Sequence, residues 1–100
     1  MSLIVAGTYR LPPENVAALK VHAAEMVAAS LAEDGCEVYS HAEDVVEPGL
    51  MRFFEIWRDE AALRVHGQAP HMKTWRAAGD ALGVTERNIG VFDATGPRKL

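Results

Sequence analysis

The sequence contains a single cysteine among its 100 residues, so no disulfide can form within the chain. Small secreted domains commonly depend on several disulfides, and a zinc site built on cysteine pairs needs more than one thiol. The sequence therefore predicts a domain that folds without covalent crosslinks. Nothing in it indicates an oxidising compartment, and we expect a soluble cytoplasmic protein.

Basic residues are also few, ten against fourteen acidic ones, which gives a net charge of −4. Proteins that bind nucleic-acid phosphates rely on clustered lysine and arginine. Here the basic residues are dispersed, and only Arg98 and Lys99 stand together. Long apolar runs are absent as well, and the apolar run within residues 1–5 is too short for a signal peptide or a membrane span. Nucleic acid and membrane are therefore not expected as partners.

Motifs for bound cofactors are missing. The sequence has no G-x-G-x-x-G or G-x-x-x-x-G-K segment to hold a dinucleotide or a nucleoside triphosphate, and no His-Glu-x-x-His. His66 and His71 are five residues apart across a glycine and a proline, so a shared helix face is not assured. We therefore expect neither a metal nor another cofactor.

Apolar residues make up 49% of the chain, which is enough for one compact domain. We expect this domain to cover residues 1–100, with 95–100 as a flexible tail. Apolar residues at three- and four-residue steps predict a helix over residues 14–33 that stops at Gly35. Asp59 can cap a short helix through Val65, which Gly67 would end, and Pro70 can open another. Short, apolar segments predict strands over residues 2–10, 36–41, 50–58 and 89–94.

This order of elements, β-α-β-β-α-β, predicts a ferredoxin-like α+β fold, in which helices cover one face of an antiparallel sheet. The other face would then be uncovered. A strand with one face exposed to solvent should carry polar side chains on that face. The first and third predicted strands, however, carry apolar side chains on both faces. We therefore expect a homodimer through the uncovered face.

Two of the four histidines, His66 and His71, flank the predicted break between the last two helices. Such breaks often border clefts, and histidine titrates near neutral pH, so a catalytic role is one interpretation. Packing and capping at a helix end are the other, and an imidazole there should contribute few packing contacts. His22 is predicted to be a solvated or packed helix residue, and Cys36 a small buried side chain rather than a nucleophile.

Large aromatic side chains more often pack in the hydrophobic core than line a ligand-binding site. In so small a domain they could also line a flat pocket. Glu55 shares one face of its predicted strand with two of them, Phe53 and Trp57. A carboxylate placed there needs an arginine or histidine partner, or its pKa should rise. A structural salt bridge at Glu55 is the alternative to a functional role.

The segment from Glu55 to Leu63, followed by His66 and by Pro70-His71-Met72, forms a recognisable pattern, which Gly35-Cys36 and Tyr39 extend. It resembles the antibiotic biosynthesis monooxygenase domain family, which includes quinol monooxygenases. The resemblance spans nearly the whole chain. It implies a ferredoxin-like dimeric α/β barrel, and a relationship to oxygenases that use neither metal nor flavin, to haem-degrading enzymes and to proteins that act on small signalling or catabolic molecules.

The sequence departs from two branches of that family. Haem-degrading relatives resemble one another in a first-strand asparagine and a haem-ligating histidine in the last helix, where this chain has Thr8 and Trp75-Arg76. Relatives that form polyketide quinones place an asparagine four residues before a strand tryptophan. Here Trp57 is kept, but the other position is Phe53. These departures disfavour haem breakdown, and the mechanism of the quinone-forming enzymes is not carried over intact.

The leading hypothesis is a cofactor-independent monooxygenase that oxidises a small dihydroxy-aromatic or quinol-like molecule with dioxygen. A deprotonated substrate of this kind is itself a reductant, so the protein needs mainly a base and an aromatic pocket. The alternatives are a ligand-binding or stress-associated dimer without catalysis, and an isomerase or lyase. We expect His66 or His71 as the base. The residues expected to contact the substrate are Trp57, Phe53, Trp75, Tyr39, His41 and Glu55.

Overall fold

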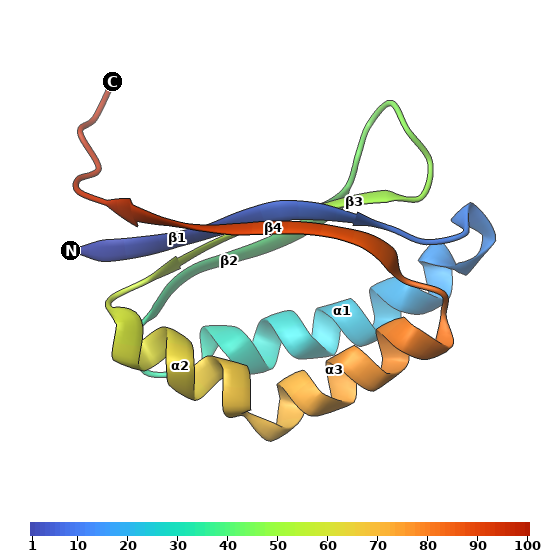
Figure 1. Ribbon diagram of the computed structural model, residues 1–100, viewed down its shortest axis with the longest axis horizontal. Helices are drawn as coiled ribbons and strands as arrows, with labels where there is room; N and C mark the ends of the chain where they lie inside the picture. Colours follow the sequence, from blue (N-terminus) through green and yellow to red (C-terminus); the bar gives the residue numbers. More distant parts are fainter.

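A computed structural model describes residues 1–100. The four strands form one antiparallel sheet in the order β2-β3-β1-β4, and all three helices lie on one of its faces (Figure 1). This arrangement confirms the predicted ferredoxin-like fold. A single-turn 3-10 helix, Pro13–Asn15, leads into α1. The elements are β1 (Ser2–Arg10), α1 (Val16–Leu31), β2 (Cys36–Glu43), β3 (Leu50–Trp57), α2 (Glu60–Gln68), α3 (Pro70–Ala81) and β4 (Thr85–Ala94).

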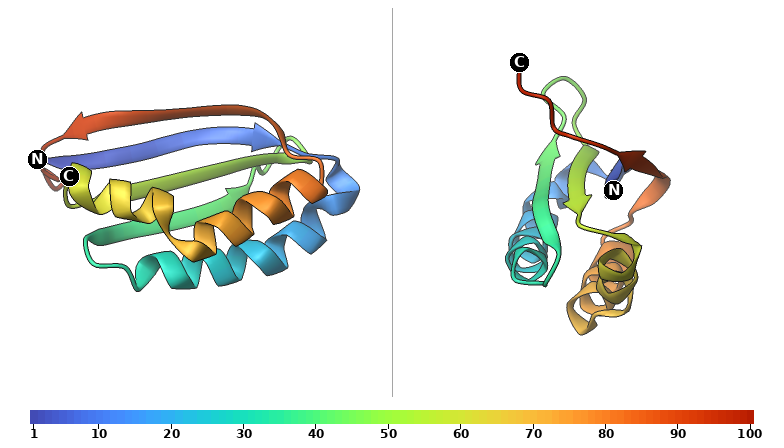
Figure 2. Two further views of the ribbon diagram at one scale, coloured as in Figure 1. Left: turned by 60° about the horizontal axis from the view of Figure 1, so that its bottom comes forward. Right: turned by 90° about the vertical axis from the view of Figure 1, so that its left-hand side faces the viewer.

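The core lies between the sheet and the helices because alternate strand residues point toward them. On β3, Met51 and Trp57 face the helices and are almost completely buried. One hydrophobic cluster packs around Trp57 and Met26, and a second packs around Leu19 and Met51. Figure 2 shows α1 beside a second column formed by α2 and α3, which follow one another end to end. No helix combines the length and the apolar character needed to cross a bilayer.

The sequence predicts that α2 runs through Val65 and stops at Gly67, but Gly67 lies inside the helix and Gln68 is its last residue. A glycine ends a helix when the chain needs a positive φ there, and Gly67 has an ordinary negative one. The break comes instead from Pro70. A proline disfavours the helical region for the preceding residue, and Ala69 is extended, with φ −66° and ψ 144°.

The turn after α1 lies against the start of α2. Gly35 has φ +87°, a left-handed conformation that side chains other than glycine's rarely adopt. A Cβ at this position would lie 2.6 Å from the Cβ of Ala62 in α2. Because the backbone passes so close to α2, Glu33 in the same turn comes within contact distance of His66.

Candidate active site

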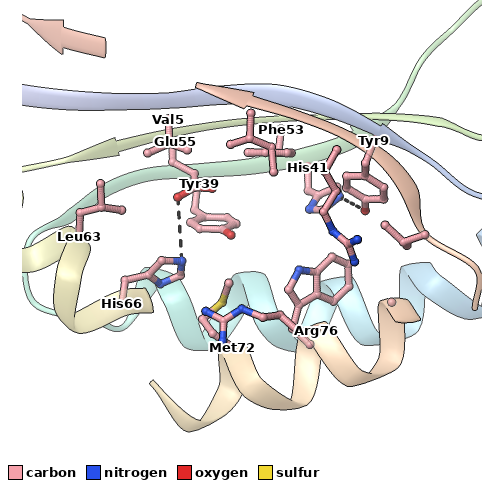
Figure 3. A pocket seen from close by; sticks show the side chains of 15 residues that line it. Val5, Tyr9, Tyr39, His41, Phe53, Glu55, Leu63, His66, Met72 and Arg76 are labelled. Carbon is pink, nitrogen blue, oxygen red and sulfur yellow. Dashed lines mark hydrogen bonds and ion pairs between the residues drawn. The ribbon is translucent and has the colours of Figure 1, made fainter. Parts of the chain in front are cut away.

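A cavity of about 320 Å³ opens between the inner face of the sheet and the helices α2 and α3 (Figure 3). Nine of its fifteen lining residues are hydrophobic, and they include residues of both core clusters. Polar groups lie at two places along it: His66 and Glu55 at one end, and Tyr9 and His41 at the other. A mostly apolar cavity with a few converging polar groups is typical of a small-molecule site.

His66 stands in the last turn of α2 and is only 4% exposed. Its Nδ1 lies 2.6 Å from Oε2 of Glu33, and its ring packs against Trp57 with the ring centroids 4.4 Å apart. A carboxylate only accepts hydrogen bonds, so the imidazole hydrogen belongs on Nδ1. The lone pair of the neutral ring is then on Nε2, which faces the cavity and lies 4.0 Å from Oε1 of Glu55.

Burial sets the electrostatics at this end of the cavity. It lowers the pKa of His66, although the hydrogen bond to Glu33 acts in the opposite direction. It also raises the pKa of Glu55, whose Oε1 accepts a hydrogen bond from Nε1 of Trp57 at 2.8 Å. Tyr39 packs beside His66, and burial raises its pKa as well. His66 is therefore held largely neutral, in the form that can accept a proton.

At the other end of the cavity, Tyr9 and His41 form a pair. The Tyr9 hydroxyl lies 2.5 Å from Nε2 of His41, and the edge of the His41 ring contacts Trp75. Nδ1 of His41 is buried without a hydrogen-bond partner. Burial lowers the pKa of His41 to about 4, so this histidine is neutral at physiological pH.

Two arginines, Arg76 and Arg87, contribute positive charge to the cavity wall. Nη2 of Arg76 donates to the carbonyl of Gly67 at 2.6 Å, which ties α3 to the end of α2. Nη2 of Arg87 donates to Asp80 at 3.0 Å. Each guanidinium has several N–H groups, so both keep donors that these contacts do not use.

The structure places most of the sequence-predicted site residues around this one cavity but not all of them. Trp57 has no exposed surface and lies behind His66 instead of lining the wall, because its indole fills the core beneath α2. The predicted residues that line the cavity are His66, Tyr39, His41, Phe53, Glu55 and Trp75.

His71 lies outside the cavity, in the first turn of α3. Its Nε2 is 3.2 Å from Oε2 of Glu33 and 3.4 Å from the hydroxyl of Ser30. The two histidines thus meet the same carboxylate from different helices, but only His66 reaches the cavity. Cys36 is half-buried, and burial raises the pKa of its thiol to about 11, which disfavours a nucleophilic thiolate.

Sequence reasoning missed four residues of the site: Glu33, Tyr9, Arg76 and Arg87. Glu33 follows a helix as one of many surface acids, and its contact with His66 spans 33 positions. No local pattern marks such a partner. Tyr9 could have been suspected, because strand alternation places it on the inner face with Val5.

Comparison with known proteins identifies relatives. Residues 2–78 match the family described as antibiotic biosynthesis monooxygenase. "Putative monooxygenase YcnE" of Bacillus subtilis is 32% identical over 81 residues, which cover 80% of this chain and 85% of that protein. The Synechocystis protein sll1783 is 35% identical over 69 residues, or 69% of this chain. The matched region spans 47% of that protein, about half its length.

Solved structures agree over almost the full chain. The crystal structure of a "putative antibiotic biosynthesis monooxygenase" from Deinococcus radiodurans is 28% identical, with a TM-score of 0.90 over 98% of this chain and 97% of that one. PA3566 from Pseudomonas aeruginosa is also 28% identical, with a TM-score of 0.84 over 95% of each chain. The match over residues 2–78 covers well over half of the sequence, and the chain belongs to the antibiotic biosynthesis monooxygenase family.

Proposed function

We propose that this protein is a monooxygenase that oxidises a small dihydroxy-aromatic molecule with dioxygen and uses no cofactor, with His66 as the general base. One observation carries the proposal. His66 is fixed by Glu33 on its Nδ1 side, and its Nε2 faces a cavity walled by aromatic side chains. Family membership supports oxygenase chemistry, and the cavity suits a flat ring.

The reaction needs no external electrons. Nε2 of His66 takes a proton from one phenolic hydroxyl, and the resulting anion is electron-rich enough to reduce dioxygen. The substrate supplies all four electrons that reduce dioxygen: two leave as the new carbon–oxygen bond forms, and two leave as the hydroquinone becomes a quinone. One atom of dioxygen bonds to a ring carbon, and the other departs as water with two hydrogens from the substrate. A hydroquinone and dioxygen thus give a hydroxyquinone and water, and all atoms balance.

The remaining cavity residues would bind and orient the ring. Phe53 and Trp75 supply flat apolar surface, and the Tyr9–His41 pair would contact a second oxygen of the substrate. Arg76 and Arg87 would stabilise the negative charge of the phenolate. Glu33 acts as a positioning residue: it holds the imidazole in the form whose lone pair faces the substrate.

The test is oxygen uptake with a panel of hydroquinones, measured in the presence of a chelator for wild type and for His66→Gln. We expect the wild type to consume oxygen and His66→Gln to be slower by roughly a hundredfold or more, the usual cost of losing a general base. His22→Gln is the matched control, because His22 lies exposed on α1 away from the cavity.

His66 packs against Trp57, contrary to the expectation that a histidine at a helix break makes few packing contacts, so its replacement should also lower stability. Glu33→Gln provides a second test, because it retains a hydrogen-bond acceptor and removes only the charge. It should lower kcat more than it shifts KM or the unfolding midpoint. If the wild type consumes no oxygen with any hydroquinone yet binds them, the cavity is a ligand-binding site. If folded His66→Gln keeps wild-type turnover, His66 is not the base.

A further inference from the structure

We propose that Glu33, His66 and His71 form a binding site for a divalent transition-metal ion with the preferences of Zn²⁺. Each residue offers one donor atom: a carboxylate oxygen of Glu33, Nδ1 of His66 and Nε2 of His71. The three donor atoms lie within 4.8 Å of one another. They come from three separate elements, the turn after α1, the end of α2 and the start of α3.

The donor set matches the chemistry of zinc. Two imidazoles and one carboxylate are a recurrent set of three protein ligands, and the fourth position is left to water. Bonds of 2.0–2.1 Å around a tetrahedral ion separate the donor atoms by about 3.3 Å. Nδ1 of His66 and Nε2 of His71 are already 2.6 and 3.2 Å from the same oxygen of Glu33. Small outward shifts of the three side chains would admit the ion.

The surroundings provide the outer contact that a metal-bound histidine needs. A histidine that ligates through one ring nitrogen usually donates its other N–H to a carboxylate or carbonyl. With a metal on Nδ1, Nε2 of His66 carries the hydrogen and points at Oε1 of Glu55, 4.0 Å away. Water can reach the site, because the side chains of Glu33 and His71 are 14% and 24% exposed.

The spacing of His66 and His71 in the sequence does not predict this site, because the third ligand, Glu33, is distant from both of them in the sequence. His66 and His71 sit on either side of the break at Pro70, so they do not share a helix face. The turn at Gly35 brings in the third donor from a distant part of the chain. The site is therefore a product of the fold and not of a local motif.

Metal binding would also act on the proposed base. A metal on Nδ1 leaves the only ring hydrogen on Nε2, so no lone pair faces the cavity and His66 can no longer take a proton. This consequence rests on the proposed function. The metal site itself does not, because binding can be measured without substrate.

The experiment is titration of the purified, chelator-stripped protein with Zn²⁺ by calorimetry and with Co²⁺ by visible absorption. We expect one ion per chain for the wild type, and a cobalt spectrum typical of nitrogen and oxygen ligands. His71→Gln should weaken zinc binding at least about tenfold, since it removes a ligand from outside the cavity. Glu33→Gln should do the same. His22→Gln, an exposed histidine outside the cluster, should bind like the wild type.

Thermal unfolding of each variant confirms that it is folded before titration. Absence of a stoichiometric site in the wild type would overturn the proposal, and so would equal affinity in His71→Gln and the wild type. Zinc that binds one per chain but leaves oxygen uptake unchanged would argue against His66 as the base and leave the metal site standing.

Discussion

His41 illustrates how burial changes the chemistry of a single residue. Its ring is enclosed by Tyr9, Phe53 and Trp75, and no acidic side chain pairs with it. Burial alone therefore decides its charge and lowers its pKa to about 4. His66 is buried too, but the hydrogen bond to Glu33 offsets part of the effect of burial on its pKa. The two histidines of this cavity therefore differ in electrostatic environment: His66 has an acidic partner and His41 has none.

The lowered pKa of His41 predicts that the folded protein loses stability in mild acid. Below pH 6.5 the unfolded chain protonates this histidine, while the folded protein does not until about pH 4. The stabilising contribution is therefore complete above pH 6.5 and is lost as the pH falls toward 4, by roughly 3 kcal/mol at most. Urea unfolding between pH 7 and 4 should show a flatter pH dependence for His41→Gln than for the wild type.

Glutamine at this position can still accept the hydrogen bond from Tyr9, so the variant removes the titration and keeps the contact. His22→Gln serves as the control and should follow the wild type, because His22 is exposed on α1. Parallel pH profiles for His41→Gln and the wild type would show that His41 does not set this acid sensitivity.

At the scale of elements, two glycines that look alike in the sequence have opposite roles. Gly35 lies in the turn after α1 with a positive φ, and it permits the close approach of this turn to Ala62 in α2. Gly67 lies inside α2 with open space around it. Both were expected to end a helix, and neither does so: α1 ends at Leu31, four residues before Gly35, and α2 continues past Gly67 to Gln68. The difference depends on the proline that follows Gly67 by three residues, since that proline already supplies the break.

Alanine substitutions should separate these two roles. Gly35→Ala should destabilise the protein by at least about 1–3 kcal/mol, because its Cβ meets Ala62 in a strained backbone conformation. Gly67→Ala should raise stability by about 0.5–1 kcal/mol, because alanine restricts the unfolded chain more than glycine does. Chemical denaturation of both variants measures the difference. A loss of stability in Gly67→Ala would indicate a packing role that the open space around Gly67 does not show.

At the scale of the whole molecule, local patterns predicted the elements, and contacts distant in sequence completed the site. Strand alternation placed Phe53 and Glu55 on one face, and the register confirms that Val5 lies opposite Glu55. That much follows from a period of two. The pairing of Glu33 with His66 and of Tyr9 with His41 follows only from how the turns set α1 and β2 against their neighbours. Periodicity carries no information on such pairs, so the sequence could not predict them.

The outer face of the sheet carries an apolar patch that no helix covers (Figure 1). The register aligns Ile4 with Ile56 and with Phe92, and Val38 with Ile56, so these side chains share the face. Phe54 lies on it as well and is 40% exposed, and Phe92 is 56% exposed. A contiguous apolar patch of this kind marks an interaction surface. We propose that it pairs with the same face of a second copy.

This proposal predicts that the protein is a dimer in solution and that a single charged substitution in the interface dissociates it. Light scattering at micromolar concentration should give twice the mass of the chain for the wild type. Phe54→Glu should give the chain mass, because a carboxylate buried at the centre of the interface has no partner. Val45→Glu is the matched control: Val45 is 99% exposed in the loop between β2 and β3, so the same change should leave the dimer intact. A monomeric wild type, or a dimeric Phe54→Glu, would exclude the sheet face as the interface.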